Sequence, residues 1–234
     1  KFKGLNLTLE TLDGLLKHNG PYYDDSDVEK LIGIKNLKNK INLKTYPSLE
    51  AQIASISDDI AYNNHDIQDG YRANLFKLDE LKEISFFNDI IKKYSRKTKK
   101  INNRVLIYQM ARDSINLMVK DLIRNSLIKF KVNKINKLND VYRSEDKLVC
   151  FSTRYENIID EIRHFLNSKM YKNNKILKKN NEGKKIIEKL FKFISNKPRK
   201  FLTFLPIKHN KYRSIADYIS GMTDRFAINI YKSI

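Results

Sequence analysis

Cysteine, glycine and proline are scarce in this sequence of 234 residues, which holds one cysteine, seven glycines and four prolines. Cys150 has no partner for an internal disulfide, and no metal-ligand spacing surrounds it. We therefore expect a buried thiol in a reducing compartment rather than a reactive nucleophile. The sequence also lacks a glycine-rich phosphate loop, a nucleophile elbow, a His-x-x-x-His pair and a cysteine cluster. These absences exclude several common enzyme motifs.

Long apolar runs are missing as well. No run approaches the roughly 18 residues that cross a bilayer, and no signal peptide is recognised. Hydrophobic residues still make up 41% of the chain, which is enough to bury a core. We expect a soluble, cytoplasmic protein with no membrane contact.

The few glycines and prolines lie mostly where a helix should begin or end. Thr8 can cap a helix to about His18, and Ser48 can cap a second helix that Gly70 closes. Further helices are predicted at 78–94, 101–130, 153–170, 183–195 and 212–230. No repeat, low-complexity linker or domain break interrupts them. The sequence therefore predicts an all-α fold in which residues 1–234 form a single domain.

Acidic residues are too few to balance the basic ones. The 46 Lys and Arg exceed the 27 Asp and Glu by 19, which taken alone favours a polyanionic partner. However, 35 of these 46 residues are lysines, and the chain is also rich in Asn, Ile and Tyr. This amino-acid usage is expected of an AT-rich coding sequence, so the excess of lysine does not require a polyanionic partner. We interpret the lysine runs at 90–100 and 175–185 as solvated helix ends or loops, with a binding patch as the alternative.

A polar stripe is the most informative feature of the second predicted helix. Asp58, Tyr62 and Asp66 are spaced four residues apart. Each four-residue step turns only about 40° round a helix, so the three side chains share one side. The apolar residues of this helix recur at three- and four-residue steps and must pack against neighbours. The stripe has the pattern of a helix that lines a ligand site.

Three blocks of sequence carry a family resemblance: LNLTLETLDGLLKHNGP at 5–21, SLEAQIASISDDIAYNNHD at 48–66 and IADYISGMTDRFA at 215–227. With them, the chain resembles the dGTPase-like deoxynucleoside triphosphate triphosphohydrolases of the HD superfamily. The resemblance implies a multi-helix, HD-domain-like bundle. Members carry an upstream histidine and a His-Asp pair before the first block. We therefore expect this chain to be the C-terminal part of a longer protein, incomplete at its N-terminus.

The resemblance also implies roles for the polar stripe. Asp58 matches the last carboxylate ligand of a divalent metal ion, Mn or Mg, which polarises phosphate and water. Asp59 is the rival, but the family places a tyrosine and an aspartate four and eight residues beyond its ligand. Tyr62 then matches a residue near the substrate's phosphates and sugar, and Asp66 one that accepts a hydrogen bond from the 3′-hydroxyl. The alternative is a solvated helix face with a structural tyrosine.

Cationic residues complete the substrate site that the resemblance implies. Lys17 and His18, at the end of the first helix, match phosphate- and substrate-contacting positions, and Lys44 resembles a further such lysine. Arg225 faces either the phosphates or solvent. Chance is a competitor for each, because lysines are so numerous. An intrahelical ion pair is predicted between Arg213 and Asp217, four residues apart.

The implied function is metal-dependent hydrolysis of a deoxynucleoside triphosphate, with dGTP as the type substrate, to deoxynucleoside and triphosphate. We expect this chain alone to be inactive, because a lone Asp58 cannot hold a catalytic metal. Relatives form oligomers, so a homo-oligomer is expected, and single-stranded nucleic acid is a further partner. The alternative function is a basic helical module that binds nucleic acid or regulates a partner. Its binding would weaken steeply with salt.

Overall fold

The structure is a computed structural model, and it describes residues 5–23, 28, 39–97, 102–202 and 210–234. The end of the lysine run at 90–100 lies outside these residues. The described residues form helices and loops without a strand, so the all-α fold class is confirmed. They divide into two compact units, residues 1–169 and residues 170–234. The single domain expected from the sequence stays a prediction, because compact units also occur within one domain.

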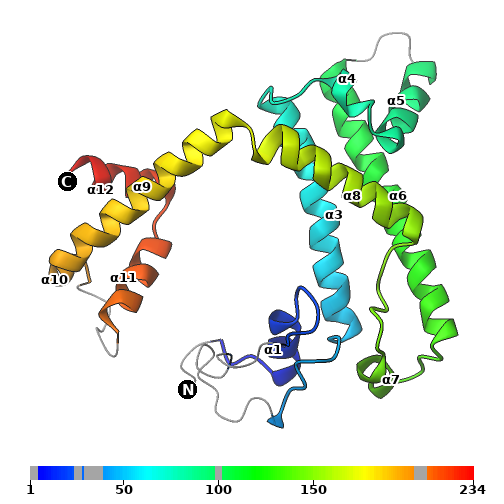
Figure 1. Cartoon of the computed structure of the whole chain (residues 1–234), viewed down its shortest axis with the longest axis horizontal. Coiled ribbons are helices and arrows are strands. Elements are labelled where there is room, and N and C mark those ends of the chain that lie inside the picture. Colours follow the sequence, from blue (N-terminus) through cyan, green and yellow to red (C-terminus); the bar gives the residue numbers. More distant parts are fainter. Residues whose placement is uncertain (1–4, 24–27, 29–38, 98–101, 203–209) are drawn as a thin grey trace. The chain divides into compact units, whose positions relative to one another are not determined.

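The first unit is built on two long helices that pack along each other (Figure 1). α1 and α8 contact the first of them, and α5 contacts the second. The helices of this unit are α1 (Leu9–Leu16), α3 (Leu49–Arg72), α4 (Leu78–Leu81), α5 (Ser85–Lys97), α6 (Asn103–Val132), α7 (Leu138–Arg143) and α8 (Thr153–Leu166). A π-helical turn, Asn167–Tyr171, follows α8 and includes the residues at which the first unit ends and the second begins.

The core of this unit lies where α3 meets α6. Ile67 of α3 and Met110 and Met118 of α6 are fully buried. Asn64 is buried beside them and donates hydrogen bonds to the Ile60 carbonyl and to Met118 Sδ, at 2.8 and 3.5 Å. The two bonds replace those that Nδ2 would make to water, whereas Asn64 Oδ1 is buried without a hydrogen-bond partner. α3 is therefore fixed in rotation about its own axis.

A buried glutamine ties the loop before α8 to the start of α3. Gln52 Oε1 accepts hydrogen bonds from the backbone N–H groups of Leu148 and Val149 at 3.0 and 3.1 Å, and Nε2 donates to the Pro47 carbonyl at 2.9 Å. Three backbone groups of irregular segments are thereby satisfied inside the fold. The contact holds α3 and a segment about 100 residues later in one arrangement.

The predicted helix starts are confirmed where capping residues stand. Thr8 Oγ1 accepts from Thr11 N and Ser48 Oγ from Ala51 N, at 3.3 and 3.4 Å. Gly70 does not end α3, which runs on to Arg72. Gly70 is instead buried, and an added Cβ would lie 2.4 Å from Phe76 Cε1. The glycine serves this close approach rather than a helix end.

Two predicted helices are each broken in the structure. Residues 78–94 form α4 and α5, joined by turns in which Glu83 and Ile84 N–H groups bond carbonyls three residues earlier. Such turns are tighter than an α-helix. They let Leu81, Ile84 and Phe87, which are three residues apart, all be buried. The predicted 212–230 helix stops at Ser220, and Thr223 caps a new one.

The second unit packs three helices and a short turn around a small apolar core. It contains α9 (Asn174–Asn196), α10 (Pro198–Phe201), α11 (Lys211–Ser220) and α12 (Asp224–Lys232). Leu190 and Ile194 of α9 meet Ile215 and Ile219 of α11 and Ala227 of α12. α9 begins nine residues before the predicted 183, because Asn173 Oδ1 accepts from Lys175 N and caps it there.

Candidate functional site

The side of α3 opposite the core carries the polar stripe. Ile56, Ile60 and Ile67 are buried, and at about 100° per residue Asp58 and Tyr62 lie on the other side of the helix, with Asp66 at the edge of the buried side. Asp58 and Tyr62 are exposed, Tyr62 by 63%, and Asp66 is half-buried. Packing of the apolar side against α6 thus turns the stripe outward. That the stripe lines a ligand pocket stays a prediction.

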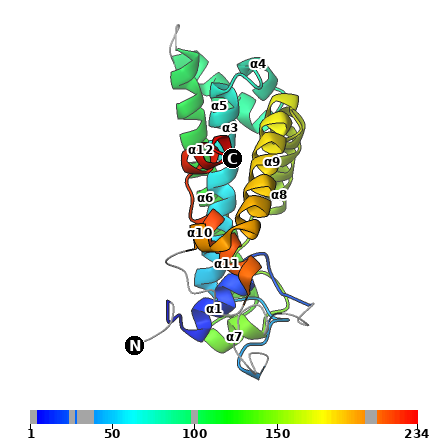
Figure 2. The same cartoon turned by 90° about the vertical axis from the view of Figure 1, so that its left-hand side faces the viewer.

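The end of α1 lies against the first half of α3. His18 Nε2 is 3.8 Å from Asp58 Oδ2, and Ser55 Oγ donates to the His18 carbonyl at 2.6 Å. Gly14 allows this approach, since a Cβ there would lie 2.9 Å from Ala51 Cβ. Figure 2 shows α1 near one end of α3 together with α7. Two residues predicted from separate blocks, His18 and Asp58, are therefore brought together.

The neighbouring aspartate has a different partner. Asp59 Oδ2 lies 3.2 Å from Arg163 NH2 on α8, and Arg163 also pairs with Asp160 of its own helix at 3.5 Å. Asp59 therefore supports the contact between α3 and α8, whereas Asp58 faces the end of α1. The choice of Asp58 over Asp59 as the candidate ligand stays a prediction.

Lys17 is buried rather than exposed. Only 2% of its surface is accessible, and Nζ lies 2.5 Å from Asp13 Oδ1 and 3.3 Å from Thr45 Oγ1. Burial raises the pKa of Asp13, and the hydrogen bond and charge of Lys17 oppose that rise. The spacing of four residues on α1 was a signal for this pair, but the sequence did not indicate its burial. Part of the positive charge of Lys17 is thus already compensated inside the protein.

Two cavities flank the contact between α1 and α3. One of about 250 Å³ is lined by Lys17, His18, Tyr46, Asp59 and Lys147, among others. The other, of about 550 Å³, lies between α1, α3 and α7 and is mainly apolar, with Leu15, Ala51 and Tyr142 in its wall. The smaller cavity gathers Lys17 and Lys147 together with Asp59, whereas Asp58 is not among its lining residues.

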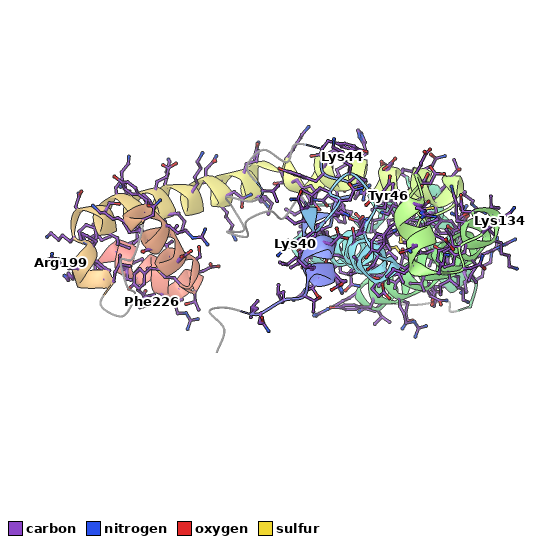
Figure 3. The ribbon with its side chains drawn as sticks, turned by 90° about the horizontal axis from the view of Figure 1, so that it is seen from below. Lys40, Lys44, Tyr46, Lys134, Arg199 and Phe226 are labelled. Carbon is purple, nitrogen blue, oxygen red and sulfur yellow. The ribbon has the colours of Figure 1, made fainter. Side chains whose placement is uncertain are left out.

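Two further cationic residues of the predicted site are Lys44 and Arg225. Lys44 is exposed in the loop before α3, where its N–H donates to Asn42 Oδ1 at 3.1 Å (Figure 3). Arg225 is exposed on α12 of the second unit. The predicted pair within α11 is confirmed, because Arg213 Nε donates to Asp217 Oδ1 at 2.8 Å.

The described residues do not supply a metal site by themselves. Among them, no group of three or more His, Cys, Asp or Glu side chains is placed to hold a metal ion. Among these residue types, the structure pairs His18 with Asp58. Cys150 is half-buried, and burial raises the pKa of its thiol, while Asn125 donates to Sγ at 3.5 Å. We therefore derive no chemical step through a metal from these residues.

None of the described helices is long and apolar enough to cross a membrane.

Residues 149–233 match the phosphohydrolase-associated domain family, a region that includes residues of both units. A deoxyguanosinetriphosphate triphosphohydrolase-like protein of Pelagibacter ubique is 60% identical over 234 residues, the whole of this chain and 63% of the relative. The chain is similar over its whole length to dGTPase-like proteins. The similarity predicted from the three sequence blocks is thereby confirmed.

More distant members of the dGTPase-like family match over the same extent. Proteins of that name from Rickettsia typhi and Rickettsia felis are 34% and 33% identical over the whole chain and 62% of their own lengths. This chain thus spans about three fifths of the length of the curated relatives that it matches. The names describe those relatives, and the activity of the whole protein is a separate question.

Proposed function

We propose that the whole protein hydrolyses a deoxynucleoside triphosphate, with dGTP as the first candidate, to deoxynucleoside and triphosphate. The observation that carries this proposal is the similarity over the full chain, at up to 60% identity, to proteins named for dGTP triphosphohydrolase. The exposed stripe on α3 supports it, because the block around Asp58 is the part of the sequence that resembles the family's site. A cytoplasmic homo-oligomer is part of the same proposal.

In this proposal Asp58 is one ligand of a divalent ion, Mn²⁺ or Mg²⁺, whose other ligands do not come from the described residues. Such an ion, when bound, polarises a phosphoryl oxygen and activates water. Asp58 is suited to the role because its carboxylate is exposed, and its contact with His18 leaves it within reach of a ligand. Asp59 is not assigned this role, because Arg163 holds it.

Tyr62 and Asp66 would bind the deoxyribose end of the substrate. The eight residues from Asp58 to Asp66 extend about 12 Å along the helix, a reach suited to the distance from the reacting phosphorus to the sugar. Tyr62, largely exposed, offers a phenol to the sugar and phosphates. Asp66 would accept a hydrogen bond from the 3′-hydroxyl.

Cationic side chains would neutralise the triphosphate. Lys17, His18 and Lys147 line the smaller cavity next to α3. Lys44 is exposed in the loop before α3. Arg225 is a separate candidate on α12 of the second unit. Because Lys17 is paired with Asp13, its contribution to phosphate binding is proposed to be smaller than that of an unpaired lysine.

The test is to incubate full-length protein and this chain alone with Mn²⁺ and each of the four dNTPs, and to quantify tripolyphosphate. We expect release by the full-length protein and none by the chain alone. In the full-length protein, Tyr62→Ala and Asp66→Ala should raise KM at least about tenfold, since each removes a substrate contact. Asp69→Ala is the matched control, because Asp69 is an exposed carboxylate one turn further along α3 that pairs with Arg72. Equal effects of all three variants, or no tripolyphosphate from the full-length protein, would contradict the proposal.

A further inference from the structure

A further cavity, of about 510 Å³, lies between α6 and the start of α8 in the first unit. Three cationic side chains line it, Lys120 and Arg124 of α6 and Arg154 of α8. A cavity of this volume is typical of sites that bind small molecules. The cavity is separate from the proposed hydrolase site, because none of its lining residues is assigned to that site.

The three cationic side chains are exposed, and among the described residues no carboxylate forms an ion pair with them. Lys120 and Arg124 are four residues apart, so they project from one side of α6 with about 6 Å between them along the helix. Lys129, further along the same helix, does have such a partner, since its Nζ lies 3.9 Å from Asp146 Oδ2. The positive charge around the cavity is therefore available to a ligand.

Asp121 is the acidic residue of the cavity wall, and the start of α8 already occupies its carboxylate. Oδ2 accepts a hydrogen bond from Ser152 N at 2.9 Å, and Oδ1 accepts one from Ser152 Oγ at 2.8 Å. Asn125 Nδ2 donates to the carbonyls of Cys150 and Phe151 at 3.0 and 2.8 Å and holds the preceding loop against α6 (Figure 1). The wall is thus formed before a ligand binds, which lowers the entropic cost of binding.

The start of α8 is itself suited to an anion. Ser152 donates its hydroxyl to Asp121, so its side chain does not cap this helix of 14 residues. The N–H groups at a helix start carry a partial positive charge, and a phosphate is stabilised beside them. Arg154 stands in the first turn, where the same partial charge disfavours a cation. An anion in the cavity would compensate both the helix start and this arginine.

A second cavity, of about 500 Å³, adjoins the first. The two share Arg154 and Tyr155 in their walls. Phe86 of α5 also lines the second cavity and packs edge to face against Tyr155, with the ring centres 5.9 Å apart. Lys93 lines it as well, but this lysine is paired with Asp113 at 2.9 Å. The second cavity is therefore suited to an uncharged, aromatic part of a ligand.

We infer that the first cavity binds the phosphate group of a small organic molecule, whose uncharged part lies against Tyr155 in the second. The lining residues of the first cavity carry a net charge of 3 minus 1, or +2. This charge matches that of a phosphate monoester at neutral pH, about −1.5 to −2. Arginine guanidinium groups bind phosphate oxygens through paired hydrogen bonds, and the lysine adds a point charge.

Exposed cations are common in this protein, so charge alone does not distinguish the cavity. Leu117 and Ile128 of α6 also line it, and they are 37% and 50% exposed. An organic ligand would cover these apolar side chains, whereas inorganic phosphate would leave them in water. The ligand is therefore an organic phosphate rather than free phosphate.

The experiment is calorimetric titration of the whole chain at low ionic strength with phenyl phosphate and, separately, with inorganic phosphate. The test variant is Lys120→Gln, Arg124→Gln, which removes two cations from the cavity wall. The matched control is Lys92→Gln, Lys131→Gln, which removes the same charge from exposed lysines that line neither cavity. Lys147→Gln is a second control, because Lys147 lines the smaller cavity beside α1. Circular dichroism checks that every variant folds.

We expect the original chain to bind phenyl phosphate at least about threefold more tightly than inorganic phosphate, because the ring contacts Tyr155. The test variant should lose at least about tenfold in affinity for phenyl phosphate, since it lacks two charged hydrogen-bond donors. Each control should lose less than about threefold, because salt screens charges at a distance. Tyr155→Leu should remove the preference for phenyl phosphate and change the affinity for inorganic phosphate less than about twofold.

Three results would overturn the inference: no binding of phenyl phosphate at millimolar concentration, equal affinity of the original chain for the two ligands, or equal losses in the test variant and the matched control. A loss that follows Lys147→Gln instead would place the phosphate beside α1 and would overturn it as well. Tripolyphosphate release by the full-length protein, which tests the proposed hydrolase activity, does not depend on these outcomes.

Discussion

His18 Nε2 lies 3.8 Å from Asp58 Oδ2, which connects the end of α1 to the exposed side of α3. The two residues are 40 positions apart, and the hydrogen bond from Ser55 to the His18 carbonyl fixes the same approach. Asp58 is therefore paired with a residue at the end of α1, whereas its neighbour Asp59 is not. The predictions below test this arrangement and the packing that supports it.

The two adjacent aspartates should respond differently to the same change. In full-length protein, Asp58→Asn should lower kcat for dNTP hydrolysis at least about 100-fold, because a metal ligand would lose its charge. Asp59→Asn should change kcat less than about threefold and cost under about 1 kcal/mol of stability, because it breaks a half-exposed ion pair with Arg163. Tripolyphosphate release and urea unfolding provide the measurements. A larger kinetic effect from Asp59 would reverse the assignment.

Close packing at Gly14 should be needed for the contact between α1 and α3. Gly14→Ala places a Cβ 2.9 Å from Ala51 Cβ, so one helix must move, at a cost of about 1 to 3 kcal/mol. Ala51→Gly in the same chain makes room, and the double variant should lose less stability than the sum of the two single variants. Thermal unfolding of the four proteins measures this coupling. Additive losses would show that the two residues do not touch.

The buried Lys17 should matter for folding through its pair with Asp13. Lys17→Met leaves the Asp13 carboxylate buried without its cation, and we expect a loss of about 3 to 5 kcal/mol. The double variant Asp13→Leu, Lys17→Met removes both charges and should come within about 1 kcal/mol of the original protein. Urea unfolding followed by circular dichroism measures both. If Lys17→Met unfolds no more readily than the original protein, the pair does not stabilise the fold.

The pair between Glu80 and Lys169 should make stability depend on pH. Lys169 Nζ lies 2.6 Å from Glu80 Oε1, and hydrogen bonds from this lysine and from the Lys77 N–H lower the pKa of Glu80. A lowered Glu80 pKa stabilises the folded state at pH values above the ordinary glutamate pKa. This stabilisation is lost as the pH falls through the lowered pKa. Lys169→Gln should lower the stability only slightly at pH 7, because both side chains are partly exposed.

The cost of Lys169→Gln should disappear as the pH falls below the ordinary glutamate value of about 4.3. Urea unfolding of the original protein and the variant at pH 7, 5 and 3 measures the difference. Lys82→Gln, which breaks the exposed pair with Asp79, should show the same pH trend, because Lys82 also lowers the pKa of Asp79. A cost of Lys169→Gln that stays constant from pH 7 to 3 would mean that its effect does not depend on the Glu80 charge.

Much of the helix order was predictable because its signals are local. Thr8 and Ser48 cap α1 and α3 as expected, since capping depends on residues within one turn. Gly70 was predicted to end a helix and instead lies beneath Phe76, a packing contact that no local pattern reveals. The break between α4 and α5 was missed for the same kind of reason, because burial of Leu81, Ile84 and Phe87 decides it.

The candidate site also combines features that the sequence predicts with features that only the structure shows. The shared side of Asp58, Tyr62 and Asp66 follows from helical spacing alone. The partner of Asp59 does not, because Arg163 is more than 100 residues away and reaches it only through the packing of α8 on α3. The burial of Lys17 also depends on Thr45 and on the loop that covers α1, which spacing along the helix cannot show.

By itself the sequence determined the helical class, the starts of the main helices, the polar stripe on α3, the family and the excess of positive charge. These properties depend on short stretches of sequence or on sums over the whole chain. They are therefore the same however the helices pack. The tertiary structure decided which aspartate is tied to Arg163, that Lys17 is buried beside Asp13, and that Lys120, Arg124 and Arg154 line one cavity. Such outcomes arise when apolar faces from distant segments meet, because burying those faces fixes the rotation of each helix.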